Sequence, residues 1–144
     1  MNRISIFGNP IFMKKNLFTN FILCGCVGWC LECFWTGLHS VIEQKDPRYL
    51  CNTSVWMFPI YGIAAIIGPI SNRLKEHTFL FRGTIYMLCI YLGEFFSGRW
   101  LKSKNACPWD YSHTKYHYQG VIRLDYAPVW FITGLLYEKI LNQK

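Results

Sequence analysis

The sequence predicts an all-α fold, an integral membrane bundle of four transmembrane helices with a long loop between the third and the fourth. Four stretches rich in apolar residues carry almost no charge, and segments approaching ~20 such residues have the length of a membrane-spanning helix. Aromatic residues make up 18% of the chain and include six Trp, and such rings concentrate at membrane–water interfaces. A Trp-rich soluble helical domain is disfavoured because its helices would each show a polar face, which the first stretch lacks.

The first predicted helix runs from Leu17 to Ile42, and Glu32 is its only charge. A charged stretch around Pro47 ends it. The residues before the helix, 1–16, are basic and weakly amphipathic. The chain is therefore predicted to consist of a basic N-terminal leader, 1–16, and a four-helix transmembrane domain, 17–144.

The second predicted helix runs from Ser54 to Asn72 without an internal charge. Ser54 is a suitable N-cap, because its hydroxyl can accept a hydrogen bond from a free backbone N–H of the first turn. Pro59 lies in the second turn and Pro69 in the last. Each proline removes a backbone donor, so we expect this helix to be kinked.

The third predicted helix runs from Phe79 to Leu101 and buries one carboxylate, Glu94. A polar and aromatic connection follows over residues 102–120. The last helix begins near Tyr126 or Pro128, since proline suits the first helical turn, and it ends near residue 141.

Four spans would place both termini on the same side of the membrane. The net charge is +7, and we divide the basic residues between the two sides. The terminal side holds Arg3, Lys14, Lys15, Arg73, Lys75, Arg82, Lys139 and Lys144, and the other side holds Lys45, Arg48, Arg99, Lys102, Lys104, Lys115 and Arg123. The terminal side therefore has 8 basic residues and the other side has 7. Since basic residues are more frequent on the cytoplasmic side of a membrane, this difference favours cytoplasmic termini. The difference is larger if Arg99 and Arg123 are buried in the protein and are not counted. The charge also suits anionic lipid headgroups, whereas no groove-reading motif predicts nucleic acid as a partner.

Glu32 and Glu94 are the candidate functional residues, because an ionisable side chain at membrane depth costs at least ~2.5–3.5 kcal/mol. We expect a buried polar cluster of Glu32, Glu94 and Asp110, with Arg123 or Arg99 as the basic member. Such a cluster can bind a proton, a cation or a substrate. Alternatively, it is structural, with its carboxylates paired or protonated and hydrogen-bonded.

The loop around Asp110 has two interpretations. Asp110 can cap a turn, which is the usual role of an aspartate in a loop. Alternatively, its aromatic neighbours Trp109 and Tyr111 fold back over the bundle, and the loop forms a gate above the carboxylates. In both cases we expect Trp109 to be buried or interfacial, and Asp110 to bind backbone amides or a base such as Arg123.

The seven cysteines do not form a secreted disulfide framework, because four lie in the first span. Cys26, Cys30 and Cys33 share one helical face, and thiolates with His39 would suit zinc or copper. Ligands on one straight helix cannot close a tetrahedron, however. Small side chains at a helix interface are the favoured interpretation, and the sequence predicts neither a metal nor a cofactor.

An ordered series of motifs resembles the membrane family labelled "putative ABC-transporter type IV", and within it the transmembrane protein 229 group. The motif residues are Gly28, Trp29, Glu32, Pro59, Tyr61, Gly62, Glu94, Gly98, Trp109, Asp110, Tyr111 and Gly120. The resemblance to that group adds residues 53–56, the block 106–112 and residues 127–131. The bacterial members carry an Asn and an Arg where this chain has His117 and Val121, which puts any role of that pair in doubt.

The resemblance implies a small multi-pass membrane protein with a transporter label. No Gly-x4-Gly-Lys-Ser/Thr loop is present, so we predict that the chain is not itself an ATPase. Ser97 and Ser112 lack the turn of a hydrolase nucleophile, and no catalytic residue is predicted. Binding or transport of a small solute, ion or lipid is the favoured function, and an accessory role in a larger membrane complex is the alternative. A small membrane enzyme that acts on lipids is the least favoured of the three. The lipid bilayer is the expected partner, with a homo-oligomer or a larger assembly as a further expectation.

Overall fold

The computed structural model describes residues 16–143, so residues 1–15 of the predicted leader lie outside the described part of the chain. The described part is mostly helical, and helices occur in all four predicted stretches. In chain order the elements are α1 (Leu17–Gln44), α2 (Met57–Gly62), η1 (Ile63–Ile66), α3 (Ile67–Arg73), α4 (Phe79–Ser103), β1 (His117–Tyr118), β2 (Ile122–Arg123), η2 (Leu124–Tyr126) and α5 (Ala127–Leu141).

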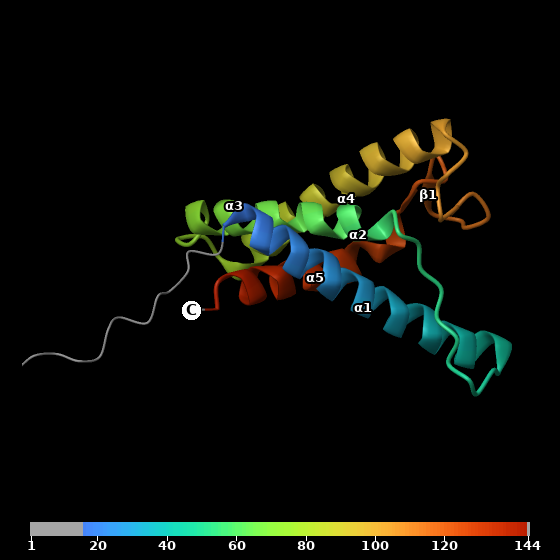
Figure 1. Cartoon of the computed structure of the whole chain (residues 1–144). Coiled ribbons are helices and arrows are strands. Elements are labelled where there is room, and N and C mark those ends of the chain that lie inside the picture. Colours follow the sequence, from blue (N-terminus) through green and yellow to red (C-terminus); the bar gives the residue numbers. More distant parts are fainter. Residues whose placement is uncertain (1–15, 144) are drawn as a thin grey trace, which may run out of the picture.

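The first helix, α1, is longer than the hydrocarbon core of a bilayer is thick. It begins where Asn16 Oδ1 accepts a hydrogen bond from the Thr19 N–H at 2.8 Å, and it ends at Lys45, whose φ of 54° is left-handed. Its 28 residues span about 42 Å at the rise of an α-helix, against a hydrocarbon core of about 30 Å. The C-terminal part of α1 therefore extends past the other helices, as Figure 1 shows.

The second predicted helix is broken into α2, the 3₁₀ turn η1 and α3. Pro69 explains the break, because its ring lacks an N–H and would collide with the carbonyl four residues earlier, which lies in η1. The start predicted at Ser54 was wrong. Ser54 Oγ instead accepts a hydrogen bond from Trp56 N at 3.3 Å in the turn before α2.

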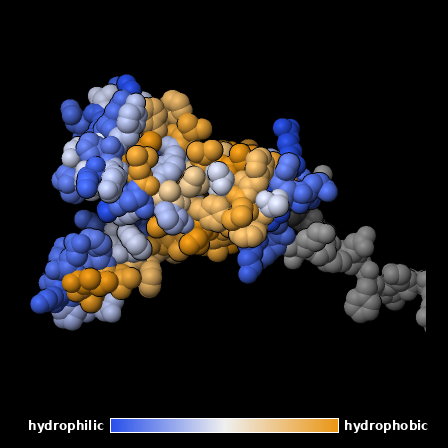
Figure 2. Space-filling model, turned by 180° about the vertical axis from the view of Figure 1, so that it is seen from behind, coloured by the Kyte–Doolittle hydropathy of each residue, from blue (hydrophilic) through white to orange (hydrophobic). Residues whose placement is uncertain are grey.

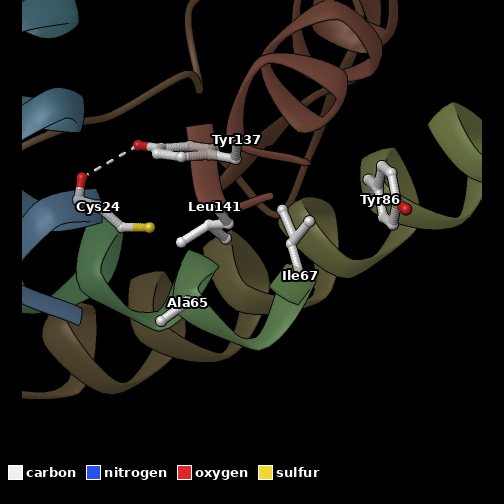
Figure 3. Packing of buried hydrophobic residues seen from close by; sticks show 6 residues of the cluster. All are labelled: Cys24, Ala65, Ile67, Tyr86, Tyr137 and Leu141. Atoms are coloured by element: carbon white, nitrogen blue, oxygen red, sulfur yellow. Dashed lines mark hydrogen bonds between the residues drawn. The ribbon is translucent and has the colours of Figure 1, made fainter. Parts of the chain in front are cut away.

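The helices pack as two pairs, α1 with α2 and α4 with α5, and α5 also runs beside α3 (Figure 1). Figure 3 shows the core where these elements meet, at Cys24, Ala65, Ile67, Tyr86, Tyr137 and Leu141. There Tyr137 donates a hydrogen bond to the Cys24 carbonyl at 3.3 Å. The Asn142 side chain donates a hydrogen bond to the Ser71 hydroxyl at 3.0 Å, where α3 ends and α5 ends. Figure 1 shows that α1 begins at this same end of the molecule.

The long connection is not purely irregular, and in this detail the all-α prediction was incomplete. Strands β1 and β2 pair antiparallel, with His117 opposite Arg123 and Tyr118 opposite Ile122. The hairpin and the loop before it lie beside the C-terminal end of α4 (Figure 1). We call residues 104–123 the loop lobe.

The surface fits a membrane protein. Helices α1 and α4 are long and apolar enough to span a bilayer, and only 17% and 22% of their most apolar windows are buried in the protein. Large side chains such as Phe34 (70% exposed) and Ile132 (66%) point outward. Figure 2 shows an apolar band between two polar ends, and an apolar surface of this extent is unusual for a soluble monomer.

Candidate functional site

Glu32 is held between α1 and the segment that precedes α2. A Cβ at Gly28, one turn earlier on α1, would collide with the root of the Tyr61 side chain. Glycine therefore lets the Tyr61 ring cross α1, and its hydroxyl lies beside the Glu32 carboxylate. On the other side, Thr53 Oγ1 donates a hydrogen bond to Glu32 Oε2 at 2.8 Å. Two hydroxyl groups, rather than a basic side chain, are thus the neighbours of Glu32.

Three further motif residues build this α1–α2 contact. The Trp29 Nε1–H donates to the Ser54 carbonyl at 3.1 Å, and Gly62 leaves room for the ring of Phe21. Pro59 lies within the first turn of α2, where its missing N–H is tolerated. The family motifs of the first two predicted helices therefore position Tyr61 and the loop beside Glu32.

Glu94 lies on the inner side of α4, where aromatic side chains surround its carboxylate. The Tyr111 hydroxyl and the Trp130 indole are its neighbours. No hydrogen bond of normal geometry reaches Glu94 Oε2 or Trp130 Nε1 from residues 16–143, although both atoms are fully buried. The Trp130 N–H and the Tyr111 hydroxyl are nevertheless close enough to be hydrogen-bonding neighbours of Glu94, and a buried polar atom without a partner would be costly.

Tyr126 of η2 holds the two aromatic neighbours of Glu94 together. Its ring contacts Tyr111 (ring centroids 6.1 Å apart), Trp130 (5.9 Å) and Trp35 of α1 (6.2 Å), each edge to face. Such pairs each contribute about 0.5–1.5 kcal/mol beyond the burial of their area. Tyr111 and Trp130 are therefore fixed in place beside Glu94.

Tyr61 is a neighbour of Glu32 and lies within electrostatic range of Glu94. Its hydroxyl is a hydrogen-bonding neighbour of Glu32, whereas Glu94 acts on it only through its charge. Thr53 and Tyr61 are thus the neighbours of Glu32, and Tyr111 and Trp130 are the neighbours of Glu94. Burial and the charge of Glu94 raise the pKa of Tyr111 well above its ordinary value, and its hydroxyl therefore stays protonated as a donor.

The loop before the hairpin docks on α4, as expected. The Trp109 ring packs on Gly98, and its Nε1–H donates to the Val121 carbonyl at 3.1 Å. The Tyr111 N–H donates to the Gly120 carbonyl at 3.0 Å. Gly120 has a φ of +67°, and a side chain there would collide with Ser112 Oγ, so only glycine fits. These contacts fix the backbone from which Tyr111 reaches Glu94.

Asp110 faces outward from this loop, and its side chain is 61% exposed. It accepts hydrogen bonds from the Ser112 N–H at 3.1 Å and from Lys102 Nζ at 3.1 Å. These bonds, led by that from the Ser112 hydroxyl, lower the pKa of Asp110 to about 2. Asp110 is therefore the turn cap of the two predicted alternatives, and its placement in a buried cluster with the glutamates was wrong.

Arg123 and Arg99 do not contact either glutamate. Arg123 forms an ion pair with Asp125 at 2.9 Å and lies 4.5 Å from the centre of the Tyr126 ring. Arg99 bonds the Gln119 side chain at 3.3 Å. The basic member predicted for the cluster was therefore wrong, because each arginine has a nearer polar partner on the surface.

Two residues at the bacterial motif positions have structural roles here. His117 Nδ1 accepts a hydrogen bond from the Gly120 N–H at 3.1 Å, which closes the turn of the hairpin. Val121 is 1% exposed and packs on Gly98. An arginine at position 121 would place a positive charge in the contact between the loop and α4, and Val121 fills this contact without a charge.

The cysteine prediction was partly wrong. Cys26 and Cys30 are exposed rather than at a helix interface, whereas Cys24 is buried in the core. Cys33 lies beside Cys51. Within residues 16–143, no three His, Cys, Asp or Glu side chains come together as a metal site.

Two groups of residues are not predicted by the sequence. Trp130 lies beside Glu94 and Tyr126 packs on the Trp130 ring, although the motif at residues 127–131 gives no indication of this contact. Arg82 of α4 and Glu138 of α5 form an ion pair at 3.1 Å, with side chains 24% and 13% exposed. The sequence could have predicted this pair, because Arg82 and Glu138 are charges of opposite sign near the ends of the third and the fourth predicted helices.

The comparisons with known proteins agree with the motif analysis at the level of the family. A model of the family described as "putative ABC-transporter type IV" matches residues 19–144. No solved structure matches the chain. Since the match covers nearly the whole sequence, the chain belongs to the putative ABC-transporter type IV family.

Proposed function

We propose that this chain is a four-span membrane protein of a transport system and that it binds a proton at Glu94, with Glu32 as the second carboxylate of the site. One observation carries the proposal. The Glu94 carboxylate is buried beside aromatic side chains, and among the described residues no basic side chain forms an ion pair with it. A buried carboxylate without a counter-ion is costly, and a bound proton would neutralise its charge.

A proton fits this site better than a metal ion or a solute. The groups next to Glu94 are the Tyr111 hydroxyl and the Trp130 indole, and the indole N–H is only a donor, so these neighbours do not supply the several oxygen ligands that a metal cation needs. Two surface hollows are lined only by apolar and aromatic residues, and Glu32 and Glu94 line neither. The geometry therefore favours the smallest ligand.

Tyr61 supports a role for both glutamates. A hydroxyl can donate and accept in turn, so Tyr61 can exchange a proton with Glu32, its hydrogen-bonding neighbour, within the electrostatic range of Glu94. Thr53, bonded to Glu32, lies in the exposed segment before α2. Chains of carboxylates and hydroxyls of this kind occur as proton relays in pumps and transporters. The site would exchange its proton on the side of the α1–α2 connection.

Four spans are part of the proposal. Besides α1 and α4, the stretch from α2 to α3 has 17 residues and α5 has 15, or roughly 25 Å and 22 Å of helix. Both are shorter than a typical span, but both pack along the two long helices (Figure 1). The basic-residue count supports cytoplasmic termini. The motifs at residues 53–56, 106–112 and 127–131 support placement in the transmembrane protein 229 group.

Proton uptake into proteoliposomes tests this function. The purified chain is reconstituted with an enclosed pH-sensitive dye, and an acid pulse is applied outside. We expect Glu94→Gln to abolish uptake and Glu43→Gln, at an exposed glutamate of α1, to retain it. Sodium and potassium gradients without a pH step serve as separate probes and should produce no flux.

The accessory role is the competing function, and the same experiment separates the two. A cluster that only orders the helices should tolerate Gln, which keeps the shape and the hydrogen-bonding groups of Glu. Unchanged uptake in Glu94→Gln, or uptake by the wild type no faster than in empty liposomes, would therefore favour the accessory role.

A further inference from the structure

The segment before α2 lies along the C-terminal part of α1 in a fixed register. A Cβ atom added to Gly37 would lie 3.1 Å from the Tyr49 carbonyl oxygen and 3.8 Å from the Cys51 Cβ. Thr36 Oγ1 accepts a hydrogen bond from the Asn52 N–H at 3.0 Å and donates to the Asn52 carbonyl at 3.2 Å. The backbone on both sides of Cys51 is therefore held against α1.

The next residues continue the register toward the start of α1. Thr53 contacts Glu32 at 2.8 Å, and the Ser54 carbonyl contacts Trp29 at 3.1 Å. Cys33 lies between these contacts, one helical turn before Gly37 and on the same face. Accordingly, the Cys33 and Cys51 thiols are hydrogen-bonding neighbours.

We propose that Cys33 and Cys51 form a disulfide that clamps the α1–α2 connection onto α1. A thiolate of the pair attacks the disulfide of an oxidoreductase, breaks its S–S bond and forms a mixed disulfide, and the second sulfur of the oxidoreductase is released as a thiolate. The second thiolate of the pair then attacks the mixed disulfide, the Cys33–Cys51 bond forms, and the oxidoreductase leaves as the reduced dithiol. The protein loses two electrons and two protons, and the incoming disulfide gains them.

The surroundings make this pair specific. Cys51 is exposed and Cys33 is half-buried, so an oxidant can reach them. Cys24 is buried in the core, and Cys26 belongs to the outward surface of α1. Disulfides persist in oxidising compartments, so the bond would place the α1–α2 connection on the side opposite a reducing cytoplasm. This inference is independent of proton binding, although the bond would also hold Thr53 beside Glu32.

The test is thiol mapping of the full-length protein from membranes of a eukaryotic expression host. Free thiols are blocked with N-ethylmaleimide during lysis, the protein is reduced, and newly released thiols are labelled with a second maleimide and located by peptide mass spectrometry. We expect the second label on Cys33 and Cys51 and on no other cysteine. In Cys33→Ser or Cys51→Ser, the remaining partner should carry the first label, whereas Cys26→Ser should leave the pair unchanged.

Two results would overturn the proposal. One is the first label on both Cys33 and Cys51 in the wild type. The other is a second label on Cys51 that persists in Cys33→Ser, which would show that another cysteine, such as Cys30, is its partner.

Discussion

The contact between Gly28 and Tyr61 gives the sharpest prediction about stability. In Gly28→Ala, the added Cβ would collide with the Cβ and Cγ atoms of Tyr61. These atoms are at the root of the side chain, so a change of rotamer cannot remove the collision and α2 must shift. Overpacking of this kind costs about 1–3 kcal/mol.

Gly93→Ala is the matched control. Gly93 lies in α4, and nothing is within 4 Å of a Cβ placed there. Both substitutions gain the helix propensity of Ala over Gly, about 1 kcal/mol. We therefore expect Gly93→Ala to be neutral or stabilising, and Gly28→Ala to be less stable than that control by about 1–3 kcal/mol.

Reversible unfolding in mixed detergent micelles measures this difference, with helix content followed by circular dichroism. Because the propensity gain is common to both variants, their difference isolates the packing cost at Gly28. Equal stability of the two variants would refute the packing of Tyr61 across α1, and with it the position of Tyr61 beside Glu32.

Three further predictions concern the loop lobe and the α4–α5 pair. Trp109→Ala should destabilise the protein by about 2–4 kcal/mol, a little below the cost for a fully buried Trp, and should raise hydrogen exchange over residues 107–111; exchange unchanged from wild type would show that the loop does not depend on this ring. Because the pKa of Asp110 is depressed to about 2 from 3.8, its contribution to stability is complete above 3.8 and is lost as the pH falls through about 2; an NMR titration of its carboxyl carbon should show this midpoint, and an ordinary value would contradict the turn cap. Arg82→Met should destabilise the protein by about 2–4 kcal/mol in thermal unfolding, because Glu138 would be left largely buried without a partner; adding Glu138→Leu should restore part of the loss, and additive losses would argue against the pair.

The sequence was sufficient to predict the helical stretches because their signals are local. The apolar runs, the proline at the start of α5 and the proline pair around η1 act through nearby residues. The exact start of α2 was missed because Ser54 bonds within a preceding turn rather than capping the helix. The short hairpin was missed because its pairing depends on the turn that His117 and Gly120 close together.

The candidate site was predictable only in part. An apolar surrounding identifies Glu32 and Glu94 from the sequence, but it does not identify their neighbours. Arg123 was a reasonable expected partner by charge, yet Asp125, two residues away, pairs with it first. Tyr61, Tyr111 and Trp130 reach the carboxylates through tertiary packing on glycines and through the docked loop, and neither composition nor spacing records such contacts.

Infrared difference spectroscopy can detect the proposed proton on Glu94 without a transport assay. The protein is measured in lipid nanodiscs while the pH is changed, and the carboxyl C=O band reports protonation whether or not the chain transports anything. We predict a pH-dependent band that is absent from Glu94→Gln, is retained in Glu43→Gln and is shifted in Tyr111→Phe, which removes a hydroxyl next to the carboxylate. An identical set of carboxyl bands in the wild type and in Glu94→Gln would contradict proton binding at this residue.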